Sequence, residues 1–385
     1  MDGYSHPAPA APLSLQSEWL RSWIVGYSAA VKGTADCFKH VLEGKPLDVG
    51  RWLELALTRQ PPSWNTPHEI VFEEPLARLR DFSTSRRSPV VPTLVLPPQA
   101  GHDSCIVDFS PEQSQMGAIL AAGLERALSL DWTGATGKTA DASVEDYVEV
   151  VDRAVTKCGG KVNLIGDCQG GWLATIYAAL HPERVNTLTL AGAPIDFHAG
   201  EPVIGEVLRR LTPGGDLHFY ESLVAAGGGV LKGEHMLSGF ISINPGDEIS
   251  RQVELLLNLD DTAHLARYRE FEDWFKHTQD IPGRFYLWIV KHLFRDNELV
   301  RGCLTVGGRR VDLARIDAPL YLLAGATDHI TPPDQVFAAA THVSTPPSEI
   351  RVDVTPGGHL GLFMSHQALA KHWPPLLAEV CRRSV

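Results

Sequence analysis

A cysteine stands where a predicted strand turns sharply into a predicted helix. The segment Gly166-Asp167-Cys168-Gln169-Gly170 follows the apolar run 162–165 and precedes a helix-like stretch, 171–180. This is the setting of a nucleophile elbow, where flanking glycines let a strained backbone pass close to its neighbours. The pattern predicts that Cys168 is a nucleophile for acyl chemistry. The alternative is a buried, inert thiol, because free cysteine packs as a small hydrophobe.

An acid and a histidine follow downstream, in the order nucleophile, acid, base. Asp328 ends a predicted buried strand over 320–328, and His359 follows a second predicted strand, 350–354, on a glycine-containing loop. In an α/β-hydrolase sheet these two positions reach the carboxyl edge beside the nucleophile. We expect His359 to take the proton from Cys168, and Asp328 to orient the imidazole. Taken singly, Asp328 also suits a turn and His359 a surface loop.

Backbone donors for an oxyanion hole are expected on two loops. One N–H group is expected from Gln169, the residue after the nucleophile. The other is expected near Gln99 or Ala100, in the loop after the predicted strand 93–96. In the same loop, His102 is either a second polar group of the site or a solvated loop histidine. No metal-ligand spacing stands out, so neither a metal nor a cofactor is expected.

The surrounding elements predict an α/β-hydrolase fold, with a mostly parallel sheet and flanking helices. The core is expected over 67–197 and 309–385. The α/β rhythm stops over 198–308, which predicts an inserted, mostly helical cap rich in aromatic residues. Apolar residues at helical spacing predict a helical N-terminal extension over 14–66, and the Pro/Ala-rich segment 1–13 predicts a disordered tail.

One face of the N-terminal extension is apolar. It is expected either to pack on the core or to dock on a partner protein or a hydrophobic granule. The helical pattern breaks at Gly44-Lys45-Pro46. The residues of this face are Trp19, Leu20, Trp23, Ile24, Tyr27 and Val31 before the break, and Trp52, Leu53 and Leu57 after it.

Composition narrows the class of protein. Of the 385 residues, 44% are hydrophobic and 21% are charged, which is typical of a globular domain. A formal net charge of −12 disfavours nucleic acid and anionic membranes as partners. No apolar stretch reaches the roughly eighteen residues that a membrane span needs. The six cysteines lack paired spacing and the first residues lack a secretory pattern, so a reducing cytoplasm is expected.

In combination, several segments resemble polyhydroxyalkanoate synthases, particularly the short class of similar length. They are 162–171, 177–183, 194–198, 296–299, 307–313, 328–332 and 358–361, with 130–132 and 146–147 upstream. The resemblance covers roughly residues 90–380. It implies a triad of Cys168, Asp328 and His359 that acts on 3-hydroxyacyl-coenzyme A thioesters, in the cytoplasm or at polymer granules. His329 matches a family histidine beside the acid and is a further candidate contact.

Two other activities stay open. The loop 98–109 resembles that of intracellular polyhydroxybutyrate depolymerases, and of a synthase-like group in which Cys-Gln-Ala/Gly-Gly-Trp precedes the helix. The leading expectation is 3-hydroxyacyl transfer through an acyl-enzyme thioester. The alternatives are hydrolysis of the polymer, of thioesters or of esters by the same triad, and an inactive granule-associated homologue. Transfer also predicts a buried Cys168 reached by a narrow channel, because water must be kept from the acyl-enzyme. Acyl chain-length preference, and whether a homodimer or a second subunit forms, stay open as well.

Overall fold

The computed structural model describes residues 16–200 and 202–385, with side chains from Ile24 onwards. The predicted tail, 1–13, lies outside the described residues. The side chains of Trp19, Leu20 and Trp23 lie outside them too.

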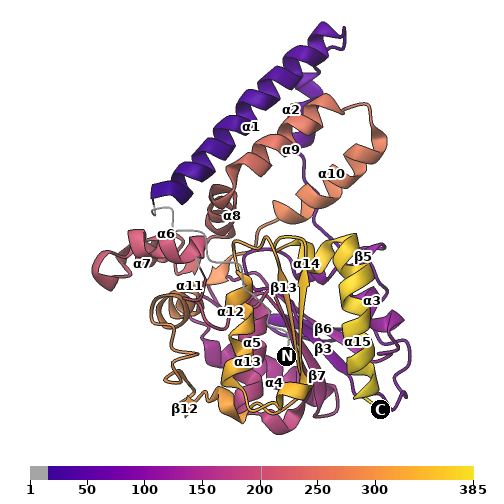
Figure 1. Ribbon diagram of the computed structural model, residues 1–385, viewed down its shortest axis with the longest axis vertical. Coiled ribbons are helices and arrows are strands. Elements are labelled where there is room, and N and C mark those ends of the chain that lie inside the picture. Colours follow the sequence, from indigo (N-terminus) through magenta and orange to yellow (C-terminus); the bar gives the residue numbers. More distant parts are fainter. Residues whose placement is uncertain (1–15, 201) are drawn as a thin grey trace, which may run out of the picture. The chain divides into compact units, whose positions relative to one another are not determined.

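The chain forms two compact units, which are described separately. The smaller unit joins the chain up to Thr58 with Gly239–Tyr268. The larger unit holds Arg59–Ser238 and Arg269–Val385. Both units are traced in Figure 1, where colour follows the sequence.

A sheet of eight strands forms the centre of the larger unit. Its order is β1-β2-β6-β3-β7-β8-β13-β14; β2 runs antiparallel to both neighbours, and every other pair is parallel. Helices α4 (Val144–Lys157), α5 (Gln169–Leu180), α12 (Pro333–Phe337) and α13 (Ala339–His342) cover one face, and α3 (Gln115–Ala121) and α15 (Trp373–Arg382) cover the other (Figure 1). The strands are β1 (Glu69–Glu73), β2 (Ala77–Asp81), β3 (Thr93–Leu96), β6 (Ala127–Trp132), β7 (Val162–Asp167), β8 (Val185–Ala191), β13 (Leu320–Gly325) and β14 (Ile350–Thr355). This is the α/β-hydrolase fold, and the fold prediction is confirmed.

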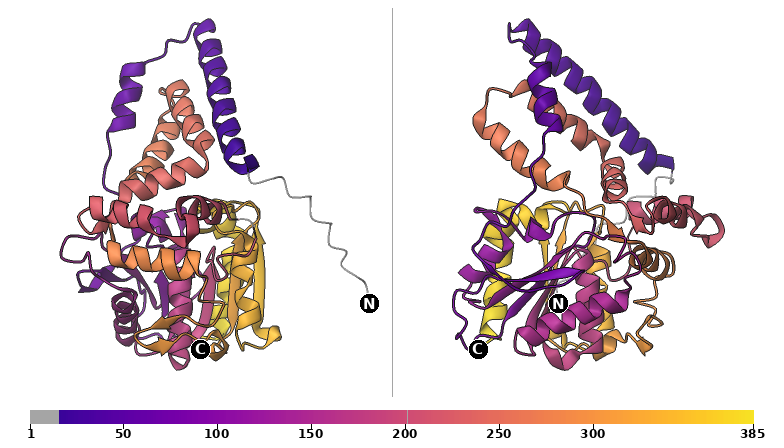
Figure 2. Two further views of the ribbon diagram at one scale, coloured as in Figure 1. Left: turned by 90° about the vertical axis from the view of Figure 1, so that its left-hand side faces the viewer. Right: turned by 180° about the vertical axis from the view of Figure 1, so that it is seen from behind.

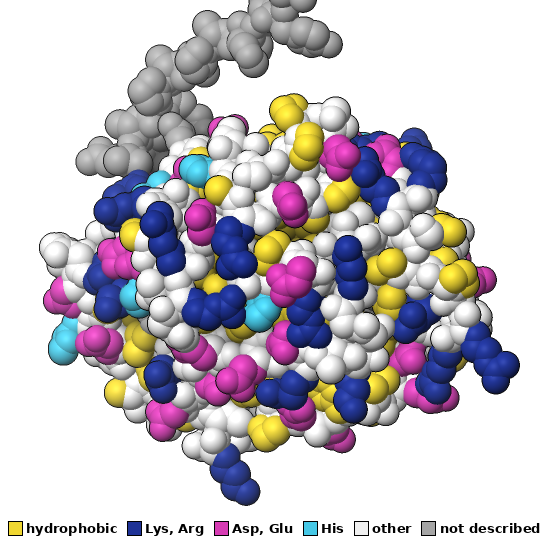
Figure 3. Space-filling model, turned by 90° about the horizontal axis from the view of Figure 1, so that it is seen from below, with side chains coloured by type: hydrophobic (Ala, Val, Ile, Leu, Met, Phe, Trp, Pro, Cys, Tyr) yellow, Lys and Arg dark blue, Asp and Glu magenta, His cyan; other side chains and the backbone are white. Residues whose placement is uncertain are grey.

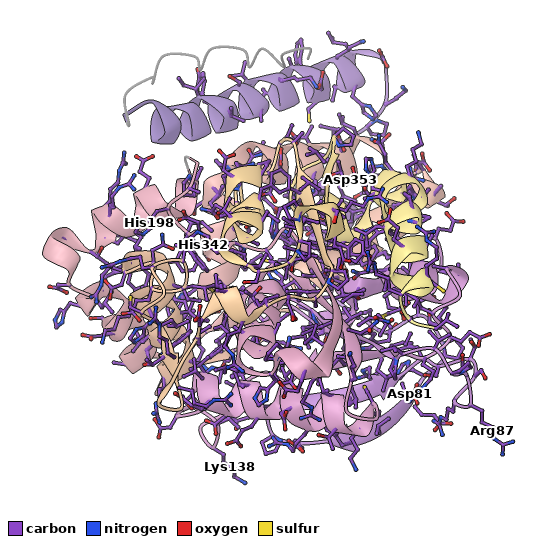
Figure 4. All side chains as sticks on the ribbon, turned by 60° about the horizontal axis from the view of Figure 1, so that its bottom comes forward. Asp81, Arg87, Lys138, His198, His342 and Asp353 are labelled. Atoms are coloured by element: carbon purple, nitrogen blue, oxygen red, sulfur yellow. The ribbon has the colours of Figure 1, made fainter. Side chains whose placement is uncertain are left out.

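The central strands are mostly apolar, as expected for strands that helices cover on both faces. Every residue of β3, β7 and β13 is buried. Burial of each large aliphatic side chain contributes about 1.5–3 kcal/mol. The edge strand β14 instead exposes Val352 and Val354, whereas its Asp353 (labelled in Figure 4) accepts a hydrogen bond from His372 at 3.1 Å.

Ten α-helices of the larger unit, and parts of two more, surround this sheet. Helix α4 begins at Ser143, whose N–H donates to Oδ2 of Asp146 at 2.7 Å and so satisfies one of the free donors of a helix start. The ten are α3 (Gln115–Ala121), α4 (Val144–Lys157), α5 (Gln169–Leu180), α6 (Val203–Leu211), α7 (His218–Ala226), α11 (Gly283–Trp288), α12 (Pro333–Phe337), α13 (Ala339–His342), α14 (Gly361–Met364) and α15 (Trp373–Arg382). Among the described helices, none combines the length and apolar character that crossing a bilayer requires.

The expected cap segment, 198–308, contains mostly helices and is divided between the units. Residues Gly239–Tyr268 belong to the smaller unit and the remainder to the larger one. The chain leaves the core at His198 (labelled in Figure 4), where Nε2 lies 2.8 Å from the carbonyl oxygen of Phe294. Besides α6, α7 and α11, the helices of this segment are α8 (Gly233–Ile243), α9 (Pro245–Leu257) and α10 (Thr262–Phe275). A lid role for this segment stays a prediction.

The smaller unit is a helical assembly. Helices α1 (Gln16–Leu42) and α9 lie side by side (Figure 2), and α2 (Val49–Leu57) also contacts α9. A Cβ on Gly33 would lie 2.6 Å from Cγ2 of Val253, so glycine lets the two helices approach closely. Of the predicted apolar face, Trp52 on α2 packs against a cluster that includes Leu255 of α9, whereas the described residues of that face on α1 are exposed. The exposed fractions are 53% at Ile24, 73% at Tyr27 and 51% at Val31.

Charge on one face of the larger unit is mixed. Lys and Arg side chains alternate with Asp and Glu over the face seen from below (Figure 3). Because the two signs are interspersed, this face does not present a large single-sign field.

Candidate active site

Cys168 lies between the last residue of β7 and the first residue of α5. Its backbone has φ 49° and ψ −116°, a conformation that is strained for a residue with a side chain. Two hydrogen bonds of 2.9 Å support it: the Cys168 N–H donates to the Ala191 carbonyl, and the Cys168 carbonyl accepts from the Gly171 N–H. The structure thus contains the sharp strand-to-helix turn that the sequence predicts.

Two glycines make this turn sterically feasible. A Cβ on Gly166 would lie 2.5 Å from Cα of Gly171. A Cβ on Gly170 would lie 1.9 Å from the carbonyl oxygen of Leu96, on the neighbouring strand β3. Real side chains do not come this close, so both positions require glycine for close approach of the backbone.

Asp328 and His359 form a buried pair. Oδ2 of Asp328 lies 2.6 Å from Nδ1 of His359. Oδ1 of Asp328 accepts hydrogen bonds from the backbone N–H groups of Ile330 and Thr331, at 2.9 Å and 2.8 Å. With both oxygens engaged, the carboxylate is held in place and orients the imidazole.

His359 interacts with Cys168 through a hydrogen bond and through charge. Because Nδ1 contacts Asp328, Nε2 is the nitrogen left for the thiol. Burial alone lowers the pKa of His359, but the charges of Cys168 and Asp328 outweigh it and raise this pKa well above its usual value. The site therefore favours the imidazolium form of His359. Cys168 itself is half-buried, which is more open than the fully buried thiol expected for a transferase.

The two expected oxyanion donors come from neighbouring segments. Gln169 is the first residue of α5, and a helix start leaves its first N–H groups without intrahelical partners. Gly170, in the first turn of α5, lies against the backbone of Leu96 and Pro97, which leads to Gln99. The Gln99 side chain is buried, and its Nε2 donates to the Tyr147 hydroxyl at 3.1 Å. This bond ties the side chain of Gln99 to α4. The oxyanion role of the two backbone N–H groups stays a prediction.

The two further candidate histidines lie in different surroundings. His102 is buried and stacks on Trp274 and Phe275, with ring centroids 5.1 Å and 5.5 Å apart. Burial lowers its pKa to about 4, so its imidazole is neutral at pH 7 and is not the solvated loop histidine considered above. His329 is exposed, and its Nδ1 lies 3.4 Å from the Thr327 carbonyl, within its own loop. The described residues contain no group of three or more His, Cys, Asp or Glu side chains that could hold a metal ion.

Sequence reasoning did not single out Asp167. This last residue of β7 is fully buried, and Oδ1 accepts a hydrogen bond from Nε2 of Gln115 at 3.2 Å. Burial raises the pKa of Asp167 to about 8, although the bond from Gln115 and the charge of His359 act in the opposite direction. The sequence feature that could have indicated Asp167 is its position at the end of a mostly apolar strand, where burial of a charged carboxylate is costly.

The strand order, the elbow and the Asp328–His359 pair beside Cys168 define a member of the α/β-hydrolase superfamily. Residues 77–380 match the family described as "Protein of unknown function (DUF3141)", and the chain belongs to this family. Within the superfamily it is a polyhydroxyalkanoate-synthase-like member.

Two curated relatives carry the name "Poly(3-hydroxyalkanoate) polymerase subunit PhaC". The protein of Haloferax mediterranei is 27% identical over 328 residues, which cover 83% of this chain and 64% of the relative. The protein of Allochromatium vinosum is 27% identical over 281 residues, which cover 70% of this chain and 75% of the relative. Among solved structures, a monoacylglycerol lipase of Paleococcus ferrophilus is 18% identical, with a TM-score of 0.48, and the match covers 80% of this chain and 99% of the lipase. Because this score is below 0.5, the fold assignment rests on the strand order instead.

Proposed function

We propose that this chain is an acyltransferase of the polyhydroxyalkanoate synthase type, which carries a 3-hydroxyacyl group on Cys168. The observation that carries the proposal is the Asp328–His359 pair at 2.6 Å with the Cys168 thiol as the partner of the same imidazole. A thiolate is the reactive form of cysteine, and an adjacent histidine activates it by taking the proton from the thiol. The names of the curated relatives point to a poly(3-hydroxyalkanoate) as the product. The resemblance of the sequence to synthases implies 3-hydroxyacyl-coenzyme A thioesters as the acyl donors.

The proposed reaction consists of two successive acyl transfers. The Cys168 sulfur forms a bond to the acyl carbonyl carbon, and the bond from that carbon to the coenzyme A sulfur breaks. His359 gives its proton to the departing coenzyme A thiolate. It then takes a proton from the accepting hydroxyl, whose oxygen forms a bond to the acyl carbon while the bond from that carbon to the Cys168 sulfur breaks. The backbone N–H groups of Gln169 and Gln99 are proposed to stabilise the oxyanion. The chemistry needs no cofactor, and we propose a cytoplasmic site of action, at polymer granules.

Hydrolysis by the same residues is the second candidate. The observation that favours it is the half-buried Cys168, because water reaches an incompletely covered acyl-enzyme more easily. The substrate would then be the polymer, a thioester or an ester, and water would replace the hydroxyl acceptor. The two activities share each triad residue and differ in the fate of the acyl group.

The product of one reaction separates these candidates. The purified protein is incubated with 3-hydroxybutyryl-coenzyme A, and both free coenzyme A and the length of the product are followed by chromatography. Transfer predicts coenzyme A together with oligomers or polymer, whereas hydrolysis predicts coenzyme A with monomeric acid only. Cys168→Ala is expected to release neither, and Cys303→Ala, which alters an exposed thiol, serves as the matched control. Release that is unchanged in Cys168→Ala would contradict both candidates.

A further inference from the structure

Next to the nucleophile, Asp167 and Gln115 share a single hydrogen bond although each could make two. Nε2 of Gln115 donates to Oδ1 of Asp167 at 3.2 Å. Within the described part of the chain, Oδ2 of Asp167 and Oε1 of Gln115 have no hydrogen-bond partner. Both side chains have an exposed fraction of 0%. The two unpartnered oxygens therefore belong to the same pair of buried groups.

A single proton on Asp167 would give both of these oxygens a hydrogen-bond partner. A buried oxygen without a partner is costly, and a buried carboxylate beside a neutral amide is costlier still. A protonated carboxyl group has an O–H donor, and a side-chain amide offers a carbonyl acceptor next to its N–H donor. An acid and an amide that face each other can thus form a ring of two hydrogen bonds, of which one is already present here.

We propose that Asp167 is protonated at neutral pH and donates from Oδ2 to Oε1 of Gln115, as a positioning residue for the nucleophile. This neutral pair joins the end of β7 to the start of α3. Cys168 follows Asp167 directly, so the pair anchors the strand end from which the elbow turns. That it matters for catalysis rests on the function proposed above, whereas its protonation does not.

The surroundings of Asp167 support the neutral form. Its neighbour on β8 is Ala191, which carries no charge, and the group on α3 is the uncharged Gln115. Among titratable groups, the imidazole of His359 acts on it through charge, and Cys168 is the next residue in the chain. A pKa raised to about 8, mainly by burial, is consistent with a proton at pH 7. A neutral carboxyl group also spares the Cys168 thiolate a like charge on the preceding residue.

The isosteric variant Asp167→Asn tests the charge. The rate of alkylation of Cys168 by iodoacetamide is measured against pH, and it needs no substrate. If Asp167 is neutral, the variant Asp167→Asn should show an apparent pKa of the Cys168 thiol within about 0.3 unit of the parent value, when the rates are measured below about pH 7. If Asp167 is ionised, its replacement removes a negative charge, and the pKa of the thiol falls by about one unit or more. The second result would overturn the proposal.

Infrared spectroscopy tests the proton directly. A protonated carboxyl band is expected in the parent protein at about pH 6, is lost by about pH 10 and is absent from Asp167→Asn. Should that variant fail to fold, Gln115→Leu gives the assignment, because loss of the amide acceptor shifts the band of the acid beside it. A parent spectrum without a protonated carboxyl band at about pH 6 would overturn the proposal, whatever the activity assay shows.

Discussion

The Nδ1 atom of His359 lies 2.6 Å from Oδ2 of Asp328, and both side chains are buried. The remaining oxygen of Asp328 accepts two backbone hydrogen bonds, so the acid cannot rotate away from the ring without losing them. This fixed pair leaves Nε2 of His359 for Cys168.

Cys168 is expected to be the most reactive of the six thiols. At near-neutral pH a small electrophile should label it fastest, because the imidazole of His359 beside it can take its proton. Peptide mapping after brief iodoacetamide treatment measures this. Burial raises the pKa of Cys105 and Cys158, so these two thiols should react slowest. Equal labelling of Cys168 and the exposed Cys303 would contradict the assignment.

Loss of the base should be nearly as severe as loss of the nucleophile. We expect His359→Ala to reduce kcat about 10⁶-fold and Asp328→Asn about 10⁴-fold, because the aspartate only orients the ring. The control is His329→Ala, which alters an exposed side chain and should keep near-parental kcat. Activity that survives in His359→Ala but not in His329→Ala would show that the base has been assigned to the wrong histidine.

The raised pKa of His359 predicts thiol reactivity at acidic pH. An imidazolium persists above its usual range, so Cys168 should alkylate at about pH 6, where ordinary thiols are almost unreactive. His359→Gln should slow this reaction more than about tenfold. The stability that a raised His359 pKa contributes is fully present below about pH 6.5 and is lost as the pH rises through the folded-state pKa. The stability difference between parent and variant should therefore shrink on the alkaline side, as measured by urea unfolding; a constant difference would contradict this.

His102 should make the protein acid-sensitive. Its pKa falls from 6.5 to about 4 on folding, so the unfolded chain binds a proton that the folded chain excludes. Stability should drop as the pH falls below about 6.5, by roughly 3 kcal/mol once pH 4 is passed.

His102→Phe keeps an aromatic ring on Trp274 and Phe275 but removes the titration. At about pH 7 we expect it to be less stable than the parent by about 1 kcal/mol, since backbone hydrogen bonds of the imidazole are lost. The gap should close by about pH 6, and at about pH 5 the variant should be the more stable of the two. Denaturant unfolding at several pH values measures both effects, and a gap that widens with acid would exclude this origin.

Gly170 should tolerate no side chain. In Gly170→Ala the new Cβ would lie 1.9 Å from the Leu96 carbonyl, so the elbow must shift away from β3. We expect the free energy of unfolding to fall by about 3 kcal/mol or more, and the alkylation of Cys168 to become slow. Gly239→Ala in α8 is the matched control, because its Cβ would meet nothing within 4 Å and alanine favours helix. Similar unfolding midpoints for the two variants would rule out the close approach.

The triad positions could be predicted because their signals are local. The elbow of Cys168 and the strand ends before Asp328 and His359 each fall within about ten residues, and the parallel topology brings strand ends to one edge. The segment that forms β2 alternates apolar residues with arginines, which suits a half-buried strand but does not indicate what pairs with the arginines. Its arginines are accommodated by tertiary partners: Arg80 lies 2.6 Å from Asp131 on β6. Such a partner is not visible from the segment itself.

The Asp167–Gln115 pair and the smaller unit could not be predicted for a related reason. Asp167 and Gln115 are separated by 52 residues, and each alone suits an ordinary polar position. Likewise, α1 meets α9 through Gly33, and nothing in the pattern of α1 indicates this close approach between segments far apart in the sequence. Long-range pairing decides these features, and local patterns do not record it.

An acyl-enzyme on Cys168 is the central claim, and mass spectrometry of the whole protein tests it most directly. After rapid mixing with 3-hydroxybutyryl-coenzyme A and an acid quench, we predict a population heavier by one or more 3-hydroxybutyryl groups. Peptide mapping should place the adduct on Cys168, and Cys168→Ala should lack it. The absence of an adduct in the parent while coenzyme A is being released, or an adduct that persists in Cys168→Ala, would contradict the account.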